Sequence, residues 1–190
     1  MSRTARLTLI IGAAVLGGAA ALVLGLSLLA DRVQSDQAEK EEKCCWKKGV
    51  TSASLSRKVG VRIPADATEK RAALKIGSRY DTALLTFTLP AKEAKEYLAD
   101  LKPPDQEMVS NDHPKGPDHR PTAPFRRLHV PEPETLTEGL RMLSLCPDSA
   151  PLDEVGEEPP GLKRLNHCVR LFTHDFEPGA TRFYIRSDIE

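Results

Sequence analysis

The chain has 190 residues, 27 of them basic and 27 acidic, so its formal net charge at pH 7 is zero. Charges of both signs are mixed along the chain, which argues against a nucleic-acid partner, because nucleic acids need a basic surface. Aromatic residues make up 5% of the chain and there are 15 prolines, so the composition predicts one domain with a small core.

An uncharged apolar run occupies residues 7–30. As a helix it would reach about 36 Å, enough to cross a hydrocarbon core of about 30 Å. We therefore expect a cytoplasmic tail at 1–6 and a transmembrane helix at 7–30 that contacts membrane lipid. A cleaved signal peptide is the alternative, although its apolar core is usually shorter. Small residues at steps of four form a stripe on which a second helix could pack: Ala13, Gly17, Ala21 and Gly25.

The charges beside this run bear on its orientation. Arg3 and Arg6 precede it, whereas Arg32 follows it next to Asp31. A long domain crosses a membrane largely regardless of its charge, so the near flanks count most. We expect a single-pass protein of the cell membrane with its C-terminal domain outside. The opposite orientation, with four free thiols in a cytoplasmic domain, stays open.

The four cysteines are typical of an oxidising compartment, where small domains often need cross-links. Cys146 and Cys168 are the natural local pair, and their disulfide would contribute about 3 kcal/mol. Cys44 and Cys45 lie in the polar stretch 31–58, which we interpret as a juxtamembrane stalk. A bond between these adjacent residues would close a small strained ring. We therefore expect them to tie the stalk to the domain or to join two chains in a homodimer, with unpaired surface thiols as the alternative.

The first half of the external domain, residues 59–190, is expected to alternate between strands and helices. Alternation of apolar and polar residues predicts a short strand at 59–64. Asp66 followed by Glu69 is a capping-box pattern, which predicts a helix from there to Ile76.

The most regular alternation is at residues 83–89, where Leu85, Phe87 and Leu89 share one face of the predicted strand. Pro90 then begins a predicted helix at 91–101. One face of this helix is apolar and consists of Ala94, Tyr97, Leu98 and Leu101.

The second half contains two proline-rich loops, 102–133 and 147–161, which we expect to be exposed and mostly irregular. Between them, Thr135 and Glu138 form a second capping box that predicts a helix to Leu145. Two alternating runs, 167–173 and 181–187, flank a Pro-Gly turn and predict a β-hairpin. Its expected core residues are Phe172, Phe183 and Ile185.

These elements predict an α+β fold. An N-terminal transmembrane helix is followed by a small four-stranded sheet with helices packed on one face.

Candidate chemical groups are concentrated in the first loop. Asp112–His113 and Asp118–His119 repeat at six residues, and His129 follows, so several metal-ligand atoms lie close in sequence. A mobile loop is a poor cage for an ion, so we expect no metal and no cofactor. His174–Asp175 lacks an evident nucleophile, and the acidic residues at 153–158 lack the spacing of a calcium loop.

Residues 62–98, RIPADATEKRAALKIGSRYDTALLTFTLPAKEAKEYL, resemble segments of uncharacterised single-pass membrane-anchored external proteins of high-GC Gram-positive bacteria. The shared features are a Pro-Ala-Asp turn, an apolar strand and a Pro-Ala helix start. The resemblance implies an external α+β domain and no activity or binding residue.

The sequence thus favours a membrane-anchored extracytoplasmic domain that binds an unidentified protein partner or assembles, without being an enzyme. Two alternatives stay open. One is an external metal-dependent or His/Asp-based hydrolase, and the other is a membrane-attached sensor or accessory subunit.

Overall fold

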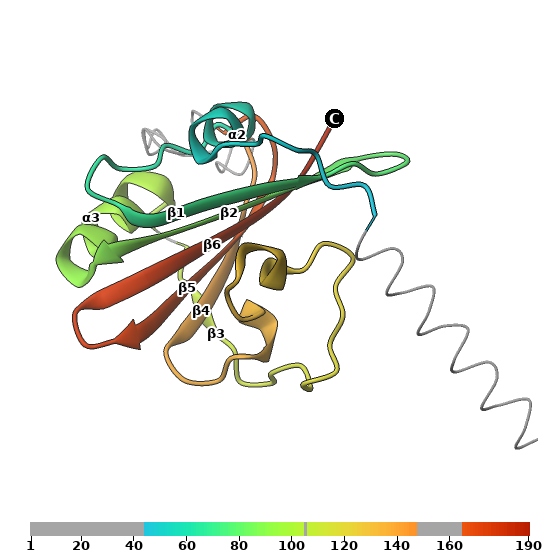
Figure 1. Ribbon diagram of the computed structural model, residues 1–190. Coiled ribbons are helices and arrows are strands. Elements are labelled where there is room, and N and C mark those ends of the chain that lie inside the picture. Colours follow the sequence, from blue (N-terminus) through green and yellow to red (C-terminus); the bar gives the residue numbers. More distant parts are fainter. Residues whose placement is uncertain (1–43, 105, 148–164) are drawn as a thin grey trace, which may run out of the picture. The chain divides into compact units, whose positions relative to one another are not determined.

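The computed structural model describes residues 44–104, 106–147 and 165–190 (Figure 1). The compact unit that contains them spans Cys44–Glu190. Its core is one antiparallel sheet with the spatial strand order β1-β2-β6-β5-β4-β3. The strands are β1 (Thr68–Lys75), β2 (Asp81–Pro90), β3 (Val109–Ser110), β4 (Leu140–Leu145), β5 (Val169–Glu177) and β6 (Ala180–Ile189).

Two helices and two 3-10 turns accompany the sheet in the described part of the chain. They are α2 (Ser52–Val59), α3 (Ala91–Leu101), η1 (Phe125–Leu128) and η2 (Pro133–Thr135). The helix α2 begins with a capping box, in which Thr51 and Ser54 exchange hydrogen bonds of 3.1 and 3.2 Å. It ends at Gly60, whose left-handed φ of 84° suits glycine.

The expected fold is therefore corrected. The sheet has six strands rather than four. Across the described ranges, no helix is both long enough and apolar enough to cross a membrane. The expected span at 7–30 lies outside the described residues, and so does its stripe of small residues, Ala13, Gly17, Ala21 and Gly25.

Three local predictions were wrong. Val59 ends α2, so the strand expected at 59–64 is absent. The helix expected from Asp66 to Ile76 is mostly β1, and the helix expected from Thr135 to Leu145 is mostly β4. In both cases pairing with a neighbouring strand outweighs a local helix-start pattern, because β1 pairs with β2 and β4 with β5.

Other predictions are confirmed. The strand at 83–89 is the middle of β2, and Pro90 precedes the helix α3 at its predicted bounds. The expected hairpin is β5–β6, and its residues Phe172, Phe183 and Ile185 are buried.

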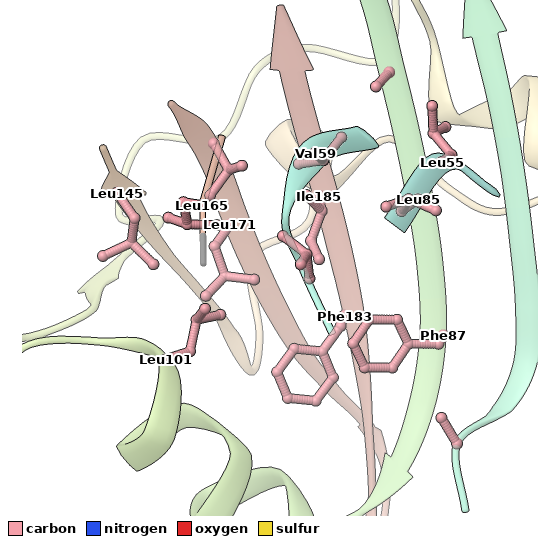
Figure 2. Packing of buried hydrophobic residues seen from close by; sticks show 14 of the residues in the cluster. Leu55, Val59, Leu85, Phe87, Leu101, Leu145, Leu165, Leu171, Phe183 and Ile185 are labelled. Atoms are coloured by element: carbon pink, nitrogen blue, oxygen red, sulfur yellow. The ribbon is translucent and has the colours of Figure 1, made fainter. Parts of the chain in front are cut away.

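Both faces of the sheet bury apolar side chains. Alternation along β2 places Leu85 in one cluster and Leu84 in the other. The first cluster includes residues of both helices and is shown in Figure 2, where Phe87 and Phe183 lie stacked with ring centroids 5.0 Å apart. The second cluster is covered by η1, whose Phe125 contacts Tyr184 edge-on at 5.2 Å.

The covering of the second face corrects the expectation for residues 102–133. This segment is largely without regular structure, but it also contains β3 and η1 and buries Ala123, Phe125 and Leu128. A proline-rich backbone is irregular, yet its apolar side chains still pack on the sheet.

Candidate functional site

A cleft of about 750 Å³ lies between α3 and the sheet, and we call it the α3 cleft. One wall is the helix, with Ala94, Leu98 and Ala99. The other walls come from Met108, just before β3, and from Thr181 on β6. This volume lies within the usual range of ligand pockets, roughly 300–1,000 Å³.

The start of α3 is tied to the hairpin turn that closes one end of this cleft. The amide of Ala91 donates to the carbonyl oxygen of Gly179 at 2.9 Å. Gly179 has φ 84°, which a glycine adopts without strain in a two-residue turn. Helix and hairpin are therefore held together at this end.

Charged side chains form the rim of the α3 cleft. Lys95 and Lys102 come from the helix side, and Arg141 and Asp175 come from β4 and β5. Arg141 donates to Asp175 at 2.9 Å, and the Thr181 hydroxyl donates to the other oxygen of Asp175 at 2.6 Å. The Asp175 carboxylate is thus engaged on both oxygens, which leaves it poorly placed to act as a base.

The lining of the α3 cleft combines apolar and charged side chains. Its described residues include no histidine, cysteine or serine, and Thr181, the only hydroxyl residue, donates to Asp175. A nucleophile needs an adjacent base to activate it. An apolar floor with a charged rim is instead typical of a site that holds an apolar group and orients it by its flanking charges.

A second cleft of about 570 Å³ lies between the β1–β2 turn, the irregular segment 102–133 and strands β5 and β6, and we call it the basic cleft. The β1–β2 turn supplies Arg79 and Tyr80, and the irregular segment supplies Lys115 and His119. Strands β5 and β6 supply Arg170 and Arg186.

The histidines singled out in the sequence are dispersed. His113 and His129 are exposed, and only His119 lines the basic cleft. Over the described ranges, no three ligand-type side chains are placed to hold a metal ion. The loop histidines therefore lack the common geometry that a metal site requires.

His174 and Asp175 do not form a pair. They are neighbours on β5, and successive strand residues point to opposite faces. Burial lowers the pKa of His174, with the charge of Arg182 as the second cause. Asp175 instead faces the α3 cleft.

The cysteines are paired within the chain. Cys146 and Cys168 lie at disulfide distance, the pairing expected from the sequence. Cys44 and Cys45 also lie at disulfide distance from each other, which corrects the expected bond to the domain or to a second chain. Cys45 has a left-handed φ of 72°, and its carbonyl oxygen accepts from the amide of Ile76 at 2.8 Å.

The sequence predicted only some of the residues that line the two clefts. The apolar face of α3 was predicted, and two of its residues, Ala94 and Leu98, line the α3 cleft. Arg141 and Asp175, however, come from strands with no local signal that would bring them to that helix. The acidic residues 153–158 lie outside the described residues.

Comparison of the chain with protein-family models, with curated proteins and with solved structures found no match.

Proposed function

We propose that the protein is a non-enzymatic binding module that takes an apolar segment of a partner protein into the α3 cleft. The observation that carries this proposal is the lining of that cleft, which is apolar at its floor and charged at its rim. The Thr181 hydroxyl in this lining donates a hydrogen bond to Asp175. Contact with membrane lipid through residues 7–30 and an external location of the domain are part of the same proposal. Two disulfide-distance cysteine pairs support an oxidising compartment.

The charges of the rim support a polypeptide segment as the occupant. Lys95 and Lys102 lie on one side, and Glu107 and Glu177 also line the cleft. A partner segment with an acidic and a basic residue beside an apolar side chain could pair with the lysines and with the glutamates. Such rim charges add orientation and association rate more than affinity.

Cross-linking of the full-length protein in its own cells tests the proposal. A photoreactive side chain at Lys95 is expected to yield a defined adduct with one partner. Ala99→Trp, which fills the cleft, is expected to abolish the adduct. Glu96→Trp is the matched control, because Glu96 is exposed on the same helix outside the cleft lining, and it should leave the adduct intact.

The proposal is wrong if no adduct forms at Lys95, or if the adduct persists unchanged in Ala99→Trp. Loss of the adduct in both tryptophan variants would also contradict it, because the effect would then not depend on the cleft.

A further inference from the structure

The basic cleft carries an inference that is independent of the α3 cleft. Four cationic side chains line it, Arg79, Lys115, Arg170 and Arg186, against two carboxylates, Glu134 and Asp188. The whole chain has a net charge of zero, so this local excess of positive charge is not a reflection of the composition.

The two carboxylates already have partners. Glu134 forms an ion pair with Arg186, and Asp188 accepts a hydrogen bond of 3.0 Å from the Thr82 hydroxyl. Arg79, Lys115 and Arg170 have no carboxylate partner among the residues that the structure describes. Four cations against two carboxylates thus leave the lining with an excess of two positive charges.

A buried donor adds an independent observation. The side chain of Arg186 is only 6% exposed, lies between Glu132 and Glu134, and lines the cleft. Its Nε is buried without a hydrogen-bond partner in the described part of the chain. An unsatisfied buried donor costs about 1–3 kcal/mol, so the guanidinium of Arg186 has part of its hydrogen-bonding capacity unused beside the cleft.

An aromatic side chain lies next to these cations. Tyr80 is 43% exposed, and the Arg79 guanidinium lies 5.2 Å from its ring centroid. Tyr80 also lines the cleft, so it offers a flat surface for the organic part of a ligand.

We propose that the basic cleft binds a phosphate ester through Arg79, Lys115 and Arg170. A phosphate monoester carries close to two negative charges and three acceptor oxygens, which matches several separate cations better than a single carboxylate does. Arginine is well suited to this group, because its planar fork donates two parallel hydrogen bonds to phosphate oxygens. The ester has two sources, a soluble phosphate compound or the head group of an anionic lipid.

Isothermal titration of the full-length protein in a neutral detergent tests this proposal. The probes are inorganic phosphate, glycerol 3-phosphate, and short-chain phosphatidic acid, a lipid phosphate monoester, with phosphatidylcholine as its zwitterionic reference. Saturable binding of at least one phosphate probe is expected. Tighter binding of phosphatidic acid than of the two soluble probes assigns the head group, and the reverse order assigns a soluble ester.

Variants show whether the cleft is responsible. Arg170→Gln and Lys115→Gln each remove one exposed cation and should weaken binding about tenfold or more. Arg57→Gln on α2 also removes an exposed cation, but outside the cleft, and should change the affinity less than twofold. Two variants at separate positions guard against a folding defect in one of them.

The proposal is overturned if no phosphate probe saturates. It is also overturned if Arg57→Gln weakens binding as much as the cleft variants, because that result would indicate general charge attraction. Neither outcome affects the cross-linking result at the α3 cleft, so the two proposals fail separately.

Discussion

At the scale of single residues, Glu69 is a surface carboxylate held by side chains of two other strands. Arg182 donates to it at 2.7 Å and the Thr88 hydroxyl at 3.1 Å. These hydrogen bonds, that of Arg182 first, lower the pKa of Glu69 below its ordinary value of 4.5. Glu69 also has a left-handed φ of 47° at the irregular register between Thr68 and Arg71. The bulge thus brings the carboxylate of β1 to the arginine of β6 across β2.

Glu69→Gln is predicted to lower the free energy of unfolding, and to lower it more at neutral pH than at acid pH. Because the pKa is lowered on folding, ionised Glu69 stabilises the folded state above pH 4.5, and this stabilisation is lost as the pH falls through the folded-state pKa. Urea unfolding at several pH values measures it. The difference between the two proteins should be largest near pH 7 and should shrink below pH 4.5.

Glu96→Gln on the exposed side of α3 is the control and should show no such trend. A Glu69→Gln difference that stays constant with pH would contradict the role given to the ionised carboxylate.

At the scale of elements, the outcome of prediction depended on where the deciding contacts lie. Residues 83–89 form a strand that alternation alone identifies, and Pro90 marks the start of α3, so both were found from local pattern. Residues 68–75 are TEKRAALK, rich in good helix formers, yet they form β1 because β2 offers backbone partners and a buried face. The pairing with β2 cannot be recognised from the sequence of residues 68–75 alone. Arg141 and Asp175, the strand residues of the α3 cleft, escaped prediction for the same reason.

The connection from β4 to β5 is closed by the pair Cys146 and Cys168, 22 positions apart. Replacing both by serine is predicted to lower the free energy of unfolding by about 3 kcal/mol, because a loop of this length is then free in the unfolded chain. Chemical unfolding measures the change.

The matched control is the double change Cys44→Ser and Cys45→Ser. These residues are adjacent, so their bond closes no intervening loop and its loss should cost far less. Equal destabilisation by the two double variants would show that loop closure is not the source of the effect.

At the scale of the whole described unit, the sheet is covered on both faces. Helices α2 and α3 contribute to one cluster, and the irregular segment with η1 contributes to the other (Figure 1). Composition led us to expect residues 102–133 to be exposed. The reason for the difference is that irregular backbone and exposed side chains are separate properties. Phe125 is fully buried, and the guanidinium of Arg186 lies 5.0 Å from its ring centroid.

Phe125→Ala is predicted to lower the free energy of unfolding by about 3–5 kcal/mol, because it removes a large buried ring from the second cluster. It should also speed tryptic cleavage at Arg126 and Arg127, next to the lost anchor. Val109→Ala is the control, since Val109 is 63% exposed and its truncation should change stability by less than about 0.5 kcal/mol. Unchanged cleavage in Phe125→Ala would mean that the segment is held by other contacts.

The position of β6 has a consequence for synthesis of the chain. It lies between β2 and β5, yet it is the last of the six strands to be synthesised. Until residues 180–189 leave the ribosome, β1–β2 and β3–β4–β5 have no ladder joining them, and each leaves an unpaired strand edge open to other chains. A nascent chain stopped before this point would expose two partial sheets with aggregation-prone edges. Its dependence on chaperones should therefore be greatest just before the last strand emerges.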